Sequence, residues 1–321
     1  MAYGPEAAAV VLAAAGAGAM GAMLPPNLAV ALLLGTLVLS YRQVIAVHPG
    51  GGGSYAVAKQ EFGRTTALLA AAGLVVDYVL TAAVSLATGA ASLASAFPVL
   101  NDHLPLVALT GLAVLTAVNL RGLADSARLL APLTLLFVLA VLAVVVLGAA
   151  RPHPVGAVGG PPTVAVTQGL GVLLVLKAFA AGCTAVSGVE AIANGVPAFR
   201  PPRVRTARRT QVLLGVLLAV MLVGLGHLMA RDHVVPRADV TVLAQLTAHS
   251  LGTGWPYYAT NLTVALLLAA AANTSFGSLP ILLALLARDD RLPTSSRSAR
   301  PGRSTAPACW AWPSSPRSCS W

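Results

Sequence analysis

Two ionisable residues lie inside a stretch of chain that is otherwise apolar and long enough to cross a lipid bilayer. Between Gln168 and Phe199 the sequence carries Lys177 and Glu190, together with five glycines and Pro197. An ionisable side chain within a membrane is costly, so it generally faces a water-filled path or a partner. Helices interrupted by small residues and proline bind ions at their free ends in secondary transporters. This segment therefore predicts a transporter site.

A second set of polar residues recurs at helical spacing in another apolar stretch. Asp77, Thr81 and Ser85 lie at intervals of four residues, so on a helix they share one face. Their oxygens could line a pathway across the membrane. The alternative for Thr81 and Ser85 is a hydrogen bond to a carbonyl of their own helix, which is common for Ser and Thr.

Small polar residues also gather in two later segments. Cys183, Ser187 and Glu190 are expected to share one helix face, and a further polar site is predicted at Asn273 and Ser275. Oxygen ligands of this kind suit a hard monovalent cation rather than a transition metal.

The two carboxyl groups and the lysine admit two interpretations. Asp77, Lys177 and Glu190 could take part in proton coupling or gating, because burial in general favours the neutral form of a carboxyl group and would let Glu190 carry a proton. Alternatively, Asp77 and Glu190 form ion pairs with Lys177 that only hold helices together. The sequence leaves both interpretations open.

The composition is that of a membrane protein. The 321 residues are 57% hydrophobic and 9% charged, with a mean hydropathy of +0.81. The formal net charge of +10 is explained by arginines in cytoplasmic loops, so nucleic acid is not expected as a partner. The sequence contains no recognisable catalytic triad, nucleotide-binding loop or metal cluster, and we therefore expect neither an enzyme nor a cofactor.

Apolar segments of about twenty residues match the length that a hydrocarbon core of about 30 Å requires. They predict an all-α, polytopic fold and a multi-pass protein of the plasma membrane. The eight expected spans are Glu6–Met23, Asn27–Val47, Thr66–Phe97, Leu104–Leu120, Leu129–Ala149, Gly169–Pro197, Thr210–Met229 and Tyr257–Leu286.

Basic residues follow every second span. Arg42, Lys59 and Arg64 follow the second span, Arg121 and Arg128 follow the fourth, and five arginines between positions 200 and 209 follow the sixth. Lys and Arg accumulate in the cytoplasmic loops of membrane proteins. These connections are therefore predicted to lie on the cytoplasmic side.

Several long segments resemble the amino acid–polyamine–organocation superfamily of permeases, and within it the KimA-type potassium importers. The resemblance covers most of residues 2–292. The segments that carry it are SYRQVIAVHPGGGGSYAVAKQEFG, VDYVLTAAVS, AVNLRGLADSA, LKAFAAGCTAVSGVEAIANGVPAFRPP and AAANTSFGSLPILLALLARDDRLP.

This resemblance implies a LeuT-like fold of two inverted five-helix repeats, with a central site between a broken first and a broken sixth helix. It implies proton-coupled uptake, with potassium and a proton, or an amino acid, as the transported partners. A homodimer of the full-length form stays an open option. The implied cation ligands are Tyr3, Thr81, Ser85, Ser187 and Glu190, with Ser187 standing where the family often has Thr.

Both ends of the chain depart from the family pattern. The family continues upstream of AYGPEA with half of the broken first helix, whose Asp belongs to the cation site. After Pro293 the chain changes to a basic tail rich in Ser and Trp, and a shifted reading frame of this tail resembles the family's next connection and helix. We expect residues 1–292 to form a partial permease domain and residues 293–321 to be frameshifted. The 321-residue product alone is predicted neither to transport nor to fold stably.

Three functional hypotheses follow. The first is a proton-coupled potassium importer, favoured by the five implied ligands. The second is an amino-acid permease, which would need backbone amides at broken helix ends to bind a carboxylate. The third is a non-transporting remnant or a membrane interaction protein.

Overall fold

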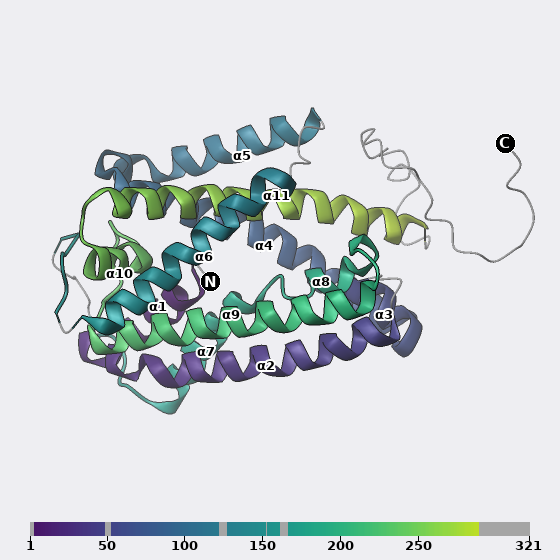
Figure 1. Ribbon diagram of the computed structural model, residues 1–321, viewed down its shortest axis with the longest axis horizontal. Helices are drawn as coiled ribbons and strands as arrows, with labels where there is room; N and C mark the ends of the chain where they lie inside the picture. The colour runs from purple at the N-terminus through teal and green to yellow at the C-terminus, as the bar shows by residue number, and fades with distance from the viewer. Residues whose placement is uncertain (1–2, 49–52, 122–126, 152, 161–165, 289–321) are drawn as a thin grey trace, which may run out of the picture.

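The computed structural model describes residues 3–48, 53–121, 127–151, 153–160 and 166–288, and all regular structure in these ranges is helical (Figure 1). This confirms the all-α class predicted from the apolar segments. A helix satisfies every backbone hydrogen bond within its own segment, which is what a chain surrounded by lipid requires. The tail at 293–321, expected to be frameshifted, lies outside the described residues.

Long helices alternate with short ones along the described chain. The long helices are α2 (Leu24–Val47), α4 (Arg64–Ala96), α5 (Leu104–Leu120), α6 (Ala127–Ala150), α9 (Arg203–Arg231) and α11 (Trp255–Arg288). The shorter ones are α1 (Gly4–Ala13), α3 (Gly53–Phe62), α7 (Val172–Gly182), α8 (Ala191–Asn194) and α10 (Val242–Leu251). The 3₁₀ segments are η1 (Ala17–Met23), η2 (Pro98–His103), η3 (Cys183–Val186) and η4 (Val196–Ala198).

Seven segments within the described ranges are long and apolar enough to cross a membrane, and they correspond to the second through eighth expected spans. The first expected span, Glu6–Met23, is different. Helix α1 ends at Ala13, Gly16 adopts a φ of 92°, and η1 then runs directly into α2. A positive φ is accessible to glycine and interrupts a helix. The stretch is therefore a short helix, and the transmembrane segment is Ala17–Val47.

Helix α5 lies at the edge of the molecule (Figure 1). None of its residues is buried, and the side chains of Leu106, Leu109 and Val114 are all more than half exposed. In a soluble protein such a contiguous apolar surface would be a liability. A helix with such a surface suits the hydrocarbon of a bilayer, in keeping with the predicted transmembrane span.

The largest group of buried side chains lies where α1, α6, α7, α9 and α10 meet. Its fully buried members include Leu12, Met20, Met23, Leu228 and Met229. Methionine has three rotatable bonds and fills irregular gaps between helices. This packing holds the short helix α1 in the interior although it does not cross the membrane itself.

Two pairs of long helices pack closely along their length. Helices α4 and α11 lie against each other, with Gly89 near the backbone of Ala265 and with Ala71 in one cluster with Leu282. Helices α2 and α9 are also neighbours, and a Cβ on Gly215 would lie 2.5 Å from a methyl group of Val38. Small residues allow helix backbones to approach closely within membranes.

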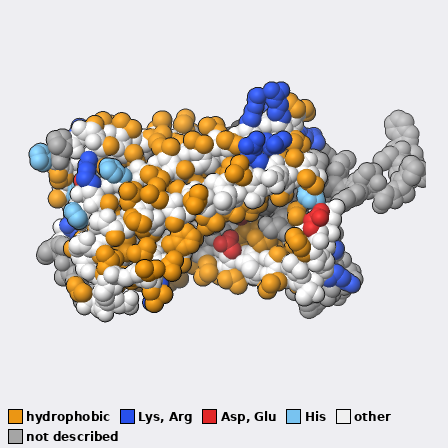
Figure 2. Space-filling model, turned by 90° about the horizontal axis from the view of Figure 1, so that it is seen from below, with side chains coloured by type: hydrophobic (Ala, Val, Ile, Leu, Met, Phe, Trp, Pro, Cys, Tyr) orange, Lys and Arg blue, Asp and Glu red, His pale blue; other side chains and the backbone are white. Residues whose placement is uncertain are grey.

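The basic segments meet at one end of the molecule. The C-terminal end of α2, the helix α3 and the N-terminal end of α9 lie together on the right of Figure 1. Figure 2 shows Lys and Arg side chains gathered at the same end. The arrangement agrees with the prediction that these connections share the cytoplasmic side.

Candidate functional site

Two interrupted parts of the chain lie against each other in the interior. Helix α1 packs along α7, and Gly4 at the start of α1 touches Ala185 in η3 so closely that an added Cβ would overlap it. One turn on, a Cβ on Gly182 would lie 3.5 Å from the Cβ of Ala8. Small side chains on both segments therefore bring the start of α1 to the point where α7 ends.

The chain after α7 leaves the helical conformation and thereby places Glu190. Ser187 has φ −59° and ψ 142°, and Gly188 has a φ of 85°. Because this stretch is not a continuous helix, the expectation that Cys183, Ser187 and Glu190 share one helix face is wrong. The carboxyl group of Glu190 instead lies near the backbone amides of Gly188 and of Glu190 itself.

On α4 the predicted polar face is present. The helix is continuous from Arg64 to Ala96, so Asp77, Thr81 and Ser85 do follow one another along one side. Ser85 is fully buried, and its hydroxyl has no hydrogen-bond partner among the residues that the structure describes. The alternative of a bond to its own helix therefore does not apply to Ser85.

A cluster of polar groups forms between the packed helices α4 and α11 and the segment that ends at Glu190, just before α8. The carboxyl groups of Asp77 and Glu190 lie near enough to interact electrostatically, and both act on the neighbouring Tyr78. The hydroxyl groups of Tyr78 and of Ser278 on α11 lie near each other. Figure 2 shows an acidic group amid the hydrophobic side chains of the middle of one face.

Lys177 does not belong to this cluster. Its side chain is exposed on α7, and it takes part in none of the ion pairs among the described residues. The structure therefore does not join Lys177 to Asp77 or Glu190.

The other predicted site residues are spread over the interior. Tyr3 is partly buried, and its carbonyl accepts a hydrogen bond of 2.9 Å from the Ala7 amide at the start of α1. Ser187 is exposed, and its hydroxyl donates to the Thr184 carbonyl at 3.0 Å. No hydrogen bond within the described ranges joins Tyr3 or Ser187 to Thr81 or Ser85. Proximity of these four residues is thus a prediction and not an observed contact.

The predicted polar site on α11 is divided between two surroundings. Ser275 is buried, whereas the Asn273 side-chain oxygen accepts a hydrogen bond of 2.6 Å from the amide of Asn119 on α5. Asn119 also donates to the Leu115 carbonyl at 2.8 Å. The Asn119–Asn273 bond therefore ties the exposed helix α5 to α11.

Sequence reasoning missed four residues of these networks: Tyr78, Asn119, Ser278 and Glu6. The carboxyl group of Glu6 on α1 accepts a hydrogen bond from the Val242 amide of α10. Tyr78 adjoins Asp77 in the chain, which was a usable signal. Nothing in the sequence indicates which residues of α11 and α10 lie opposite these side chains, because the pairing depends on how the helices pack.

Such a cluster can bind a cation or a proton. Two carboxyl groups in one low-dielectric site repel each other when both are charged, and a bound cation or proton relieves the repulsion. Hydroxyl groups of Tyr and Ser supply further oxygen atoms without adding charge. Ionisable residues within a membrane are in general candidates for a functional site.

Comparisons with known proteins identify the family of the chain. The model of the family described as "Amino acid permease" matches residues 2–312. The chain is also 38% identical over 301 residues to the protein named "Potassium transporter KimA" of Bacillus subtilis (strain 168), an alignment that covers 91% of this chain and 49% of the relative. The chain thus spans about half the length of this relative.

The matches cover nearly all of the described structure, including the two interruptions and the polar face of α4. Together with the seven apolar helices they identify a multi-pass protein of the plasma membrane. The resemblance noted from the sequence segments is confirmed. The chain belongs to the amino acid permease family.

Proposed function

We propose that this chain forms a large part of the transmembrane region of a proton-coupled potassium importer. The observation that carries the proposal is that Asp77 lies near enough to Glu190 for their carboxyl groups to interact electrostatically, where the chain between η3 and α8 is not helical. Broken helices with inward carboxyl groups are the typical cation sites of secondary transporters.

Two further observations support the proposal. The relative at 38% identity is named a potassium transporter. The buried Ser85 hydroxyl on the same side of α4 has no partner among the described residues, and a bound cation would supply one. Buried polar groups without a hydrogen-bond partner are rare in folded proteins, so a ligand is a reasonable partner for this hydroxyl.

Uptake is best measured with a completed protein, in which residues 2–292 of this chain are joined to the parts of the Bacillus subtilis relative that they do not cover. Rubidium is added outside cells that lack other potassium uptake systems. The initial rates of rubidium uptake are then compared with and without an imposed proton gradient. We expect saturable uptake that rises with inward proton force. A rate of rubidium uptake that is independent of the proton gradient would contradict proton coupling. A correctly inserted protein that takes up no rubidium would contradict the proposal of a potassium importer.

A second candidate is an amino-acid permease, in keeping with the description of the family. Between η3 and α8 the backbone at Ser187 and Gly188 is non-helical, and backbone of this kind can bind the carboxylate of an amino acid. The same cells distinguish the candidates. Competition of rubidium uptake by unlabelled potassium supports the importer, whereas accumulation of labelled amino acids without rubidium supports the permease.

The domain division is part of the proposal. Residues 1–292 are the permease part, and residues 293–321 are a tail read in a shifted frame. Resequencing the gene across the boundary between residues 292 and 293 and through the tail is the direct test. An intact frame through the tail, shared by related genes, would contradict the shift. The third hypothesis, a non-transporting remnant, gains support if the shift is real and the 321-residue product shows no uptake.

A further inference from the structure

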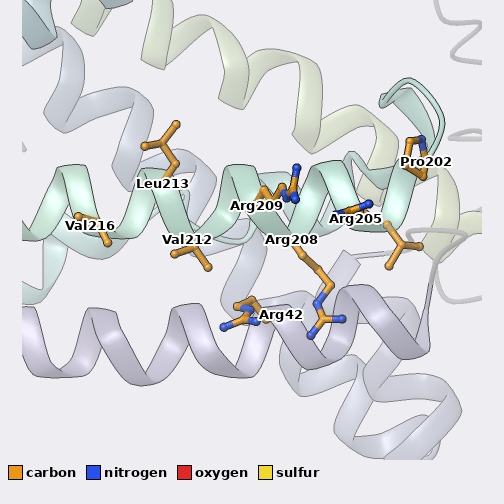
Figure 3. Close-up of a pocket in the computed structure, with 9 residues that line it drawn as sticks. Arg42, Pro202, Arg205, Arg208, Arg209, Val212, Leu213 and Val216 are labelled. Carbon is orange, nitrogen blue, oxygen red and sulfur yellow. The ribbon is translucent and has the colours of Figure 1, made fainter.

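A groove lined by arginines and aliphatic side chains lies between α2 and α9 at the basic end of the molecule. Its volume is about 820 Å³. It is lined by Arg42, Pro202, Val204, Arg205, Arg208, Arg209, Val212, Leu213 and Val216. Figure 3 shows Arg208 reaching from α9 toward Arg42 on α2, with Arg205 and Arg209 on the same helix nearby.

The charge of this groove is uncompensated. The lining includes four arginines and no carboxylate. None of the four takes part in an ion pair within the described ranges, and the Nε atoms of Arg42 and Arg208 are buried without a hydrogen-bond partner there. A guanidinium group normally finds an acceptor when its nitrogens leave water, and its planar donors match a phosphate.

The other half of the groove is apolar and open. Val212, Leu213 and Val216 lie on α9 one to two turns farther along the helix from the arginines, on the side of the membrane interior. The side chains of Leu213 and Val216 are 70% and 57% exposed. The groove thus offers cationic donors at one end and an aliphatic surface at the other.

We propose that this groove binds an anionic phospholipid of the cytoplasmic leaflet. The phosphate lies against Arg42, Arg205, Arg208 and Arg209, and the first part of an acyl chain lies along Val212, Leu213 and Val216. Basic pockets between transmembrane helices on the cytoplasmic side recognise lipid headgroups by this combination of charge and depth. The aliphatic end favours a lipid over a soluble anion, because a free phosphate would leave it uncovered.

Such a lipid would contact both α2 and α9 at the basic end of the molecule. It lies apart from the Asp77–Glu190 cluster and does not depend on what that cluster transports. Its failure would therefore leave the proposed importer untouched.

The test is a lipid titration, in detergent, of the completed protein described under Proposed function, read by native mass spectrometry. Phosphatidylglycerol is compared with phosphatidylcholine of the same acyl chains, and inorganic phosphate is added as a competitor. The first variant is Arg205→Gln with Arg209→Gln, two exposed positions whose loss leaves the core unchanged. The second is Arg208→Gln, and the matched control is Arg203→Gln on the same helix outside the groove.

We expect phosphatidylglycerol to bind more tightly than phosphatidylcholine. Each arginine near the membrane surface contributes about fivefold in affinity, so the double variant should lose roughly 25-fold and Arg208→Gln about fivefold. Arg203→Gln should bind as the parent does. Equal binding of the two lipids, or equal loss in Arg203→Gln, would overturn the proposal. Displacement of the lipid by millimolar phosphate would assign the site to a soluble anion instead.

Discussion

Glu190, just before α8, and Asp77, in the middle of α4, lie near enough for their carboxyl groups to interact electrostatically. The two residues are far apart in the chain. They come near each other because the chain turns out of the helical conformation after η3, where Gly188 adopts a positive φ and its amide lies near the Glu190 carboxyl group. A straight helix through this segment would not place Glu190 in the same way.

Replacing either carboxyl group should weaken potassium transport. In the completed protein we expect Glu190→Gln and Asp77→Asn each to lower the apparent affinity for potassium by about 10- to 100-fold, since an interaction with a charged group contributes about 1.5–3 kcal/mol. The measurement is rubidium uptake against potassium concentration. The control is Glu61→Gln, whose carboxylate is half exposed and pairs with His48 at 3.5 Å. Unchanged affinity in both site variants would remove these groups from the cation path.

The Ser85 hydroxyl should affect affinity and stability in opposite directions. If it binds the transported cation, Ser85→Ala lowers the apparent affinity by about fivefold, the effect of about 1 kcal/mol. Without cation the same variant should unfold at an equal or higher temperature, because a buried hydroxyl without a partner is removed. Rubidium uptake and thermal unfolding in detergent test the two parts. A lower unfolding temperature with unchanged affinity would mean that the hydroxyl is only structural.

The close contact of Gly4 with Ala185 predicts a cost for any larger residue. Gly4→Ala would force α1 away from η3, and overpacking of this kind costs about 1–3 kcal/mol. Thermal unfolding of the completed protein should show the loss. Gly73→Ala on α4 is the matched control, because an added Cβ there meets nothing within 4 Å. The control should be neutral or stabilising, since Ala favours a helix over Gly by up to about 1 kcal/mol.

Tyr257 connects the start of α11 to the end of α4. Its hydroxyl donates a hydrogen bond of 2.6 Å to the Ser95 carbonyl, and the Ser95 hydroxyl accepts one of 3.0 Å from the Thr241 amide. Tyr257→Phe leaves a buried carbonyl with one partner fewer, and we expect a loss of about 1 kcal/mol in unfolding free energy. Tyr258→Phe, at a position 47% exposed, should change stability little. Similar effects of the two variants would contradict a specific role for this bond.

His249 predicts a pH-dependent stability at the other end of the molecule. It lies on α10, outside the membrane-spanning helices, with Nδ1 3.8 Å from Asp232 Oδ2. Burial lowers the pKa of the His249 imidazole below its ordinary value of 6.5; Asp232 opposes this, while Arg237 and Arg231 add to the lowering. The folded protein thus favours the neutral ring.

The sign of the effect follows from linkage. Below its ordinary pKa the imidazole of the unfolded chain takes up a proton more readily than that of the folded chain. The stability that the neutral His249 ring gives the folded state is therefore fully present above pH 6.5. It is lost as the pH falls through the lowered pKa of the folded state. Thermal unfolding between about pH 7.5 and about pH 5 should show a smaller acid loss in His249→Gln than in the parent. An equal loss in both would assign the pH dependence to other groups.

The apolar segments by themselves determined the class of protein and the approximate position of seven spans, and the basic connections between them predicted which segments lie together at one end. These properties depend on local composition, because a span needs only enough consecutive apolar residues and a basic loop needs only its charge. The spacing of Asp77, Thr81 and Ser85 likewise sufficed to place them on one side of α4, since a continuous helix has a fixed period.

Only the tertiary structure decided where the first helix ends and which side chains of different helices lie next to each other. Glycines in the sequence indicated broken helices, but not that Gly16 ends the first segment before it can span the membrane or that Ser187 turns away from the helix face expected for it. The pairing of Tyr78 with Ser278 depends on the register between α4 and α11. That register is set by close packing of small residues over the whole interface, which no local pattern in the chain encodes.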